Sequence, residues 1–390
     1  MDIFKRALEL HESLKGKLNV ENKLDVQSKE DLSLVYSPGV AEPCKVIHAF
    51  PDKVYDLTIK GNTVAIVTDG SAVLGLGNIG ALASIPVMEG KAMLFKRFAG
   101  INGFPICLET QDTEEIIHIV KNIAPVFGGI NLEDIAAPRC FEIEERLQDI
   151  GIPVFHDDQH GTAIVVLAAL MNFCKITGRK IKDLRIVING AGAAGIAISR
   201  YLGKADAETP NQEIAKEIIV CDSHGIVGPL RTDLNDFKKA LLTYTNPHAV
   251  DGNVFDAIVD ADVFIGVSKE NLLDRNDIRT MAKDPLILAL ANPIPEILPE
   301  EAYAGGAFAV GTGRSDFPNQ VNNVLAFPGI FLGALRSKAP RITLAMKFAA
   351  AAAIANGISN PTREQIIPPV MDESIAHKVA DAVASFAEKA

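Results

Sequence analysis

The chain contains no tryptophan, and its five cysteines are scattered through 390 residues without a C-x-x-C pair. This pattern argues against a disulfide framework or a structural zinc site and is typical of reduced thiols in the cytoplasm. The N-terminus lacks the layout of a signal peptide. The most apolar tract, residues 342–358, is short and rich in alanine, which favours a packed helix over a membrane span. We therefore expect a cytoplasmic protein without a membrane partner.

Basic charge is also scarce, because 38 lysines and arginines face 49 acidic residues and leave a net charge of −11. No long block of like charge interrupts the chain. Both features argue against a nucleic-acid partner. Hydrophobic residues make up 48% of the chain, which is enough for real cores, and its length of 390 residues predicts two or three domains.

Acidic side chains stand where predicted elements change. Residues 152–155 predict a buried strand that stops at Asp157 and Asp158, after which we expect the chain to turn through Gly161 into a long apolar helix from Thr162. Carboxylates at the carboxyl end of a strand usually face a cleft. An alternative is that both aspartates only cap that helix. A zinc site is a further alternative, because residues 156–160 imitate H-E-x-x-H, although that motif requires a helix and a glutamate.

A second acidic pair, Glu133 and Asp134, follows a glycine-rich turn at another predicted boundary. Adjacent side chains on a regular helix diverge, so these two carboxylates could share one ion only at such a boundary. With Asp158 they would supply three hard oxygen ligands, a set that suits Mg²⁺ or Mn²⁺ and leaves positions for water and substrate. Helix capping by Asp134 is the alternative.

Two segments fit the G-x-G-x-x-G pattern of dinucleotide-binding proteins, residues 75–80 and residues 190–195. The second lies between two apolar runs, 184–189 and 217–221, and completes the β-α-β unit that the pattern requires. In such a unit the glycines let the backbone approach a pyrophosphate at a helix N-terminus, and an acid meets the ribose hydroxyls. We therefore assign dinucleotide binding to Gly190, Gly192, Ala193, Ala194, Gly195 and Asp222.

The first fingerprint is the weaker candidate. Pro86 and Gly90 follow it within about three turns, and we expect them to interrupt a helix that would carry a cofactor. Residues 75–80 are therefore assigned to tight packing or substrate contact.

A lysine, a tyrosine and two asparagines are further candidates for the site. Lys91 stands among small and apolar neighbours, where it either extends to water or is desolvated, and desolvation lowers the pKa of a lysine toward that of a general base. Tyr36 lies on fixed backbone beside a Pro-Gly turn, with burial between domains as the alternative. Asn292 and Asn323 could bind a substrate carboxylate or a nicotinamide, although asparagines more often form turns.

These motifs together resemble malic enzyme, in the same order over nearly the whole chain, and the length resembles the small bacterial form. Larger relatives carry an arginine that helps to hold malate, and the matching position here is Ala72. Substrate binding would then fall to Asn292, Asn323 and backbone N–H groups near Gly75. The motifs that carry the resemblance are residues 35–40 (VYSPGV), 68–70 (TDG), 74–77 (LGLG), 133–134 (ED), 155–162 (FHDDQHGT), 291–293 (ANP), 322–323 (NN) and 327–329 (FPG).

The resemblance implies oxidative decarboxylation of L-malate to pyruvate and CO₂ with reduction of NAD or NADP. It implies that Lys91, with Asp157 nearby, accepts the hydroxyl proton during hydride transfer, and that Tyr36 protonates enolpyruvate. The metal would act as a Lewis acid on the C2 oxygen. Its ligands would be Glu133, Asp134 and Asp158.

The expected fold class is α/β in two domains. Residues 1–160 would form an N-terminal α/β domain for substrate and metal. Residues 161–390 would form a Rossmann-type domain with a doubly wound parallel sheet, with the C-terminal helices packing back on the first domain. We expect a homodimer or a higher homo-oligomer.

Asp222 favours NAD over NADP, because its charge would repel a 2′-phosphate and the next residues, Ser223 and His224, offer no cation. Arg231 could fold back and weaken this preference. Three other functions stay open: a malolactic enzyme that retains its NADH, another Rossmann dehydrogenase that needs no metal, and a non-enzymatic NAD sensor.

Overall fold

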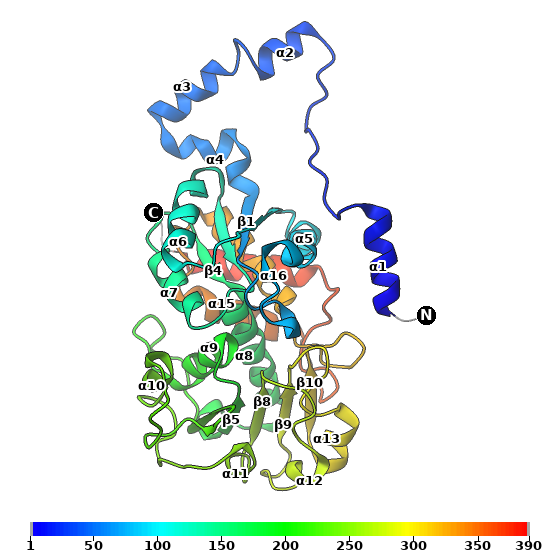
Figure 1. The fold of residues 1–390 in the computed structure, drawn as a ribbon, viewed down its shortest axis with the longest axis vertical. Helices are drawn as coiled ribbons and strands as arrows, with labels where there is room; N and C mark the ends of the chain where they lie inside the picture. The colour runs from blue at the N-terminus through cyan, green and yellow to red at the C-terminus, as the bar shows by residue number, and fades with distance from the viewer. Residues whose placement is uncertain (1–2, 388–390) are drawn as a thin grey trace.

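The computed structural model describes residues 3–387 of the chain. In Figure 1 an N-terminal arm begins with a helix to the right of a first sheet and then reaches above that sheet, and a second sheet lies at the opposite end of the molecule. The outer ends of the two predicted domains, residues 1–2 and 388–390, lie outside the described residues.

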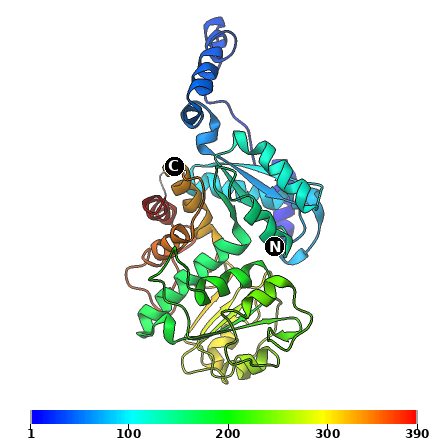
Figure 2. The same ribbon diagram turned by 90° about the vertical axis from the view of Figure 1, so that its left-hand side faces the viewer.

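The arm consists of four helices, none of which has a buried residue. Figures 1 and 2 show α2 and α3 projecting away from the rest of the chain. A capping box starts α2, since the Ser28 hydroxyl accepts from Asp31 N and the Asp31 carboxylate accepts from Ser28 N. The helices are α1 (Ile3–Leu14), α2 (Lys29–Val35), α3 (Ala41–Ala49) and α4 (Val54–Leu57).

The first sheet has four parallel strands in the order β2-β1-β3-β4. Every residue of β1, β3 and β4 is buried, as expected for parallel strands covered on both faces. Its strands are β1 (Thr63–Thr68), β2 (Asn102–Cys107), β3 (Gly129–Leu132) and β4 (Val154–His156), and its helices are α5 (Gly80–Ala99), α6 (Thr113–Ile123) and α7 (Arg139–Arg146).

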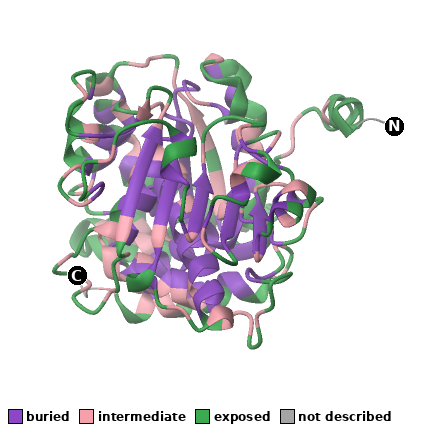
Figure 3. Cartoon of the chain, turned by 90° about the horizontal axis from the view of Figure 1, so that it is seen from below, coloured by how far each residue is buried: buried purple, intermediate pink, exposed green. Residues whose placement is uncertain are grey.

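The second sheet has six strands in the order β10-β9-β8-β5-β6-β7, all parallel except β7. Counted from β5, this is the 3-2-1-4-5-6 order of a Rossmann sheet, which confirms the predicted fold class. Figure 3 shows buried strands covered by helices. The strands are β5 (Arg185–Asn189), β6 (Glu217–Asp222), β7 (Gly225–Ile226), β8 (Val263–Gly266), β9 (Leu286–Ala289) and β10 (Ala309–Thr312), and the helices are α9 (Ala193–Gly203), α10 (Asp236–Leu241), α11 (Val254–Ala257), α12 (Arg275–Ile278) and α13 (Pro299–Gly305).

One long helix, α8 (Asp157–Thr177), joins the two sheets. Its length and composition would allow it to cross a membrane, but it is mostly buried within the protein and serves as a core helix. The C-terminal helices α14 (Phe327–Ser337), α15 (Leu344–Ala355) and α16 (Ser374–Ser385) follow the second sheet. Phe327 returns to the first sheet, where its ring lies 4.7 Å from that of Phe95 on α5.

Two expectations about helices are wrong. Helix α5 runs unbroken through Pro86 and Gly90, because the buried side chains on its inner face outweigh the one backbone hydrogen bond that proline removes. Helix α8 begins at Asp157, five residues before Thr162, so the predicted boundary between residues 160 and 161 falls inside it.

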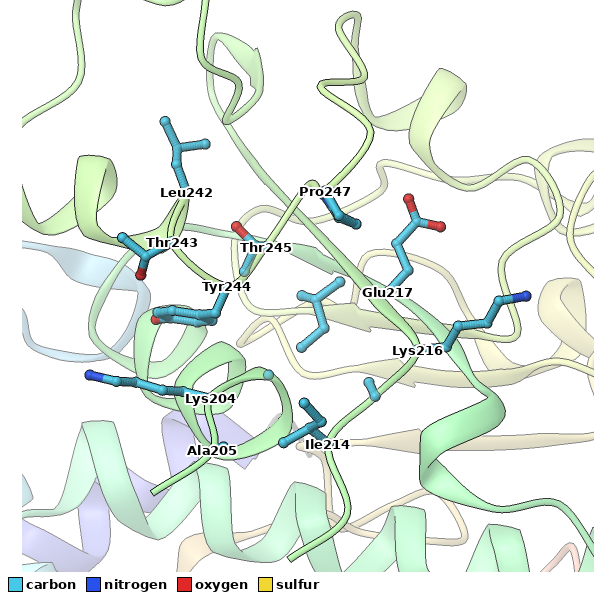
Figure 4. A pocket seen from close by; sticks show the side chains of 13 residues that line it. Lys204, Ala205, Ile214, Lys216, Glu217, Leu242, Thr243, Tyr244, Thr245 and Pro247 are labelled. Carbon is cyan, nitrogen blue, oxygen red and sulfur yellow. The ribbon is translucent and has the colours of Figure 1, made fainter. Parts of the chain in front are cut away.

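A cavity of about 470 Å³ opens beside Glu217, the first residue of β6, and is lined by Lys204 and Tyr244 (Figure 4). Ligands of open α/β sheets bind at the carboxyl ends of the strands. This cavity lies at the amino end of β6 and is therefore separate from the expected dinucleotide site.

Candidate active site

The acidic residues predicted as ligands meet at the carboxyl edge of the first sheet. Strand β3 ends at Leu132, directly before Glu133 and Asp134, and β4 ends at His156, directly before Asp157 and Asp158. The strands are neighbours, with Leu132 paired to His156. This register brings the two acidic pairs together although they are more than twenty residues apart.

Glu133, Asp134 and Asp158 each offer an oxygen within 4.8 Å of the others. Among the described residues this is the group of His, Cys, Asp and Glu that could hold a metal ion. Asp134 has a left-handed backbone with φ +53°, so its side chain departs from the direction it would take on a regular strand. Its N–H donates to Asp158 Oδ2 at 2.8 Å, which ties the two loops together.

Lys91 of α5 reaches this cluster from the side. Its Nζ lies 2.5 Å from Asp157 Oδ2, 2.8 Å from Glu133 Oε1 and 4.1 Å from the centre of the Phe327 ring. Burial alone would lower the pKa of Lys91, but the ion pairs with Asp157 and Glu133 outweigh burial and raise that pKa. Lys91 therefore fits neither alternative: its side chain is buried and does not extend to water, and its ion pairs hold its proton in place of the lowered pKa of a desolvated lysine.

Negative charge exceeds positive charge in the cluster, since one ammonium faces the carboxylates of Glu133, Asp134, Asp157 and Asp158. Burial, opposed by the ion pair with Lys91, raises the pKa of Asp157 to about 7, and burial raises the pKa of Glu133 and Asp158 as well. Lys91 cannot neutralise this set alone. Hard oxygen donors with uncompensated charge fit a divalent cation such as Mg²⁺ or Mn²⁺.

Asn323 joins the cluster from the C-terminal half of the chain. It belongs to a 3₁₀ turn, Asn323–Leu325, and its Nδ2 donates to Asp157 Oδ2 at 2.5 Å. A Cβ on Gly161 would collide with Asp157 Oδ1 and with the Asn323 side chain. Gly161 therefore permits this close approach and does not form the turn that we expected there.

The second fingerprint has the backbone that dinucleotide binding needs. Gly190 has φ +128°, and a Cβ there would collide with Val267 O. A Cβ on Gly195 would collide with Gly190 O, whereas one on Gly192 would meet nothing within 4 Å. The tight turn at Gly190, the open space at Gly192 and the close packing at Gly195 are the backbone features of a Rossmann turn. Ala193 and Ala194 begin α9, whose N-terminus faces the same space.

Asp222 ends β6 as predicted, but cations occupy its carboxylate. Arg231 Nη1 lies 2.7 Å from its Oδ1, and Lys238 Nζ lies 2.6 Å from its Oδ2. Arg231 also pairs with Asp233 at 2.5 Å. Arg231 was a candidate from the sequence, whereas Lys238 was not, because a lysine sixteen residues away carries no local signal of this contact.

Asn292 lies in the loop that follows β9. It is exposed, and a Cβ on Gly75 would collide with its backbone carbonyl oxygen. The glycine-rich loop of the first domain therefore touches the loop after β9 in the second. Ala72 donates its N–H to Asp134 O and offers no charge in place of the arginine of larger relatives.

The structure does not bring Tyr36 to this cluster. Tyr36 caps the C-terminus of α2 on the projecting arm, and 68% of its surface is exposed (Figure 1). Tyr36 is therefore not buried between the domains, and in this conformation it does not reach the carboxylate cluster of its own chain.

The zinc alternative fails on geometry. His160 on α8 contacts Glu144 and Tyr201, and His156 lies 3.3 Å from Asp158, so the two imidazoles have different partners. Glu144 and Tyr201 were not predicted, because nothing in their local sequence marks either as a partner of His160.

Comparison with known proteins agrees with this arrangement. The family description "Malic enzyme, N-terminal domain" matches residues 15–148, and "Malic enzyme, NAD binding domain" matches residues 159–388. The chain is 54% identical to the bifunctional malic/malolactic enzyme of Bacillus subtilis, covering 99% of this chain and 93% of that protein. It is 52% identical to the NAD-dependent malic enzyme of Geobacillus stearothermophilus, covering 95% and 77%.

Among solved structures, the NAD-dependent malic enzyme of Thermotoga maritima superposes with a TM-score of 0.92 at 48% identity, covering 97% of this chain and 98% of that one. Two family matches, these identities and a common fold point the same way. The chain belongs to the malic enzyme family and is an oxidoreductase with an NAD-binding domain.

Proposed function

We propose that the protein oxidises and decarboxylates L-malate to pyruvate and CO₂ with reduction of NAD, in a reaction that depends on Mg²⁺ or Mn²⁺. The main support for this proposal is the position of Lys91, which pairs with Asp157 and with Glu133. Glu133 is also one of the three carboxylates that could hold a cation. A divalent cation held by Glu133, Asp134 and Asp158 would supply Lewis-acid polarisation of the malate C2 oxygen.

Lys91 Nζ donates to Asp157 Oδ2 at 2.5 Å, so Asp157 is placed to take the proton that Lys91 must lose before it can act as a base. A cation bound to Glu133 would weaken the ion pair between Glu133 and Lys91. The pKa of Lys91 would then fall toward that of a general base. Once Lys91 has passed its own proton to the Asp157 carboxylate, the neutral amine takes the C2 hydroxyl proton while the hydride leaves for the nicotinamide. Asn323 and Asn292 orient the substrate carboxylates from the second domain.

Tyr36 would donate a proton to C3 of enolpyruvate, and we propose that it does so in the site of a second copy of the chain. The arm that carries it is unburied throughout, and its exposed side chains include Leu32, Leu34 and Val35. Exposed apolar side chains in such a series indicate a surface that a partner covers. A homodimer in which the arms cross would cover them and complete both sites.

The direct test is formation of NADH or NADPH from L-malate with Mn²⁺, before and after addition of EDTA. We expect turnover that EDTA removes and that added Mn²⁺ restores. Turnover at the full rate in EDTA would contradict the proposed metal site, and a lack of pyruvate would contradict the reaction.

Asp158→Asn and Glu133→Gln are expected to weaken Mn²⁺ binding at least about tenfold, because each removes a charged oxygen ligand. Asparagine caps a helix as well as aspartate does, so a mere cap at Asp158 would tolerate the change. Titration calorimetry with Mn²⁺ measures the effect, and excess Mn²⁺ should restore part of the rate. Unchanged Mn²⁺ affinity in both variants would show that the cluster is not a metal site.

Protons should compete with the metal at the same cluster. The pKa of Glu133 and of Asp158 is raised by burial, so both take up protons at a higher pH than ordinary carboxylates do. Mn²⁺ affinity measured by the same titration should therefore fall as the pH is lowered from 8 to 6.

NAD is the proposed cofactor, because Asp222 holds Arg231 and Lys238 away from a 2′-phosphate. Asp222→Ser alone is expected to raise the NADP/NAD ratio of kcat/KM at least about tenfold, because it frees two cations and removes a repulsive charge. The matched control is Asp222→Ser with Arg231→Ala, which should lose much of that gain. A wild-type kcat/KM higher for NADP than for NAD would contradict the assignment.

A malolactic reaction is the second candidate, favoured by the name of the relative from Bacillus subtilis, a bifunctional malic/malolactic enzyme. The same residues would serve it, with NADH retained in the site and lactate released. Product analysis with catalytic amounts of NAD distinguishes the two, because only the malolactic reaction forms lactate beyond one equivalent of cofactor.

A further inference from the structure

Three helices meet through side chains that the proposed reaction does not use. Tyr201 of α9 places its hydroxyl 2.9 Å from Nδ1 of His160 on α8. His160 Nε2 lies 2.9 Å from Oε2 of Glu144 on α7. All three side chains are buried, so water does not substitute for these contacts.

The hydrogen bond between His160 and Glu144 has a fixed direction. Burial alone would raise the pKa of Glu144, but its contacts with His160 hold that pKa at about 2, so the carboxylate only accepts. His160 therefore donates from Nε2 to Glu144, and its other ring nitrogen, Nδ1, forms the hydrogen bond with the Tyr201 hydroxyl.

Glu144 also holds the first turn of α8 directly. Its Oε1 accepts from His156 N at 3.1 Å, and its Oε2 accepts from Gln159 Nε2 at 3.0 Å. One buried carboxylate thus binds three groups within residues 156–160. The same turn carries Asp157 and Asp158, so its orientation sets where both carboxylates point.

Tyr201, at the other end of this series of hydrogen bonds, lies on α9, the helix that follows the predicted dinucleotide-binding turn. Tyr201 stands in the second half of α9, whose N-terminus carries the Gly190–Gly195 turn. Its ring stacks on His160 at a centroid distance of 5.9 Å and packs against Phe348 at 5.4 Å. A shift of α9 on binding a dinucleotide would reach His160 through a hydroxyl that is already in hydrogen-bond contact.

We propose that Tyr201, His160 and Glu144 are positioning residues that couple the two ligand sites, so that a dinucleotide at α9 and a divalent cation at the carboxylate cluster strengthen each other's binding. The inference rests on the proposed metal and dinucleotide sites. Coupling of this kind is reciprocal, since each ligand must change the affinity of the other by the same factor.

The experiment measures Mn²⁺ affinity by titration calorimetry, with and without saturating NADH and in the absence of malate. We expect NADH to tighten Mn²⁺ binding about fivefold or more in the wild-type protein, within the usual range of coupling between sites. Tyr201→Phe keeps the packed ring and removes only the hydroxyl. It should reduce the factor to below about twofold while leaving Mn²⁺ affinity without NADH nearly unchanged.

Tyr244→Phe is the matched control, because the Tyr244 hydroxyl contacts Ser199 on α9 and takes no part in the contacts of His160 and Glu144. It should keep the full coupling factor. NADH affinity, followed by the fluorescence of NADH with and without Mn²⁺, should give the same factor in each protein. Glu144→Gln provides a second variant: its amide would face three donors, and it should weaken Mn²⁺ binding even without NADH.

The outcomes separate the two levels of the proposal. Wild-type protein that binds Mn²⁺ and NADH independently, or a Tyr201→Phe variant that keeps the coupling, would overturn this inference alone. Wild-type protein that does not bind Mn²⁺ would overturn the proposed metal site and the coupling with it. If Tyr201→Phe fails to fold, Glu144→Gln decides, and unchanged Mn²⁺ affinity in that variant would overturn the inference.

Discussion

Lys91→Ala is expected to lower kcat for malate oxidation by about three orders of magnitude or more, the usual effect of removing a general base. The lysine is buried and touches two carboxylates of the cluster, so its loss removes both the base and their counterion. Mn²⁺ affinity should be kept or increased, because a positive charge beside the cation site disappears. Kinetics and Mn²⁺ titration on the same preparation measure both effects.

Lys91→Arg distinguishes proton transfer from ion pairing. Arginine keeps the positive charge for Asp157 and Glu133 but does not give up a proton in proteins. We expect it to preserve the thermal stability of the wild-type protein and to restore little activity. Lys96→Ala, on the exposed side of the same helix, should leave the rate unchanged. Substantial activity in Lys91→Arg would assign Lys91 to charge balance alone.

The sequence predicted the acidic cluster because each acidic pair stands at a predicted boundary between elements. Asp157 and Asp158 follow β4, which was predicted as a strand, whereas Glu133 and Asp134 follow β3, where only a glycine-rich turn was predicted, and adjacent parallel strands end at one edge. The dinucleotide turn was predictable for a similar reason, since Gly190, Gly192 and Gly195 have separate local tasks. Residue type and spacing carry this information without any long-range contact.

Long-range contacts account for what the sequence did not predict. The pKa of Lys91 depends on two carboxylates more than forty residues away, and a sequence pattern contains no record of such neighbours. Pro86 does not break α5, because buried side chains on both sides of it hold the helix. Helix α8 begins early because Glu144 on another helix binds the groups of its first turn.

The position of Tyr36 gives the remaining prediction, which concerns two inactive variants. Tyr36→Phe should lower formation of pyruvate strongly by removing the proton donor for enolpyruvate, whereas hydride transfer suffers less than in Lys91→Ala. If Tyr36 serves its own chain, a mixture of the two variants stays inactive, because every site lacks one group. If it serves a partner, a mixed dimer contains one site with both Lys91 and Tyr36.

Co-expression of Tyr36→Phe and Lys91→Ala is therefore expected to restore about one quarter of wild-type activity, because half of randomly formed two-fold dimers are mixed and each has one complete site. Activity is measured as pyruvate formed per chain after purification through one tag that both variants carry, so that mixed and unmixed dimers are assayed together. Co-expression of Lys91→Ala with Asp157→Asn is the matched control. Both of these side chains belong to one cluster within one chain, so a mixed dimer contains no complete site and should stay at background. Background activity in the first pair as well would place Tyr36 in its own chain's site, which would require the arm to fold back from the position that α2 and α3 occupy here.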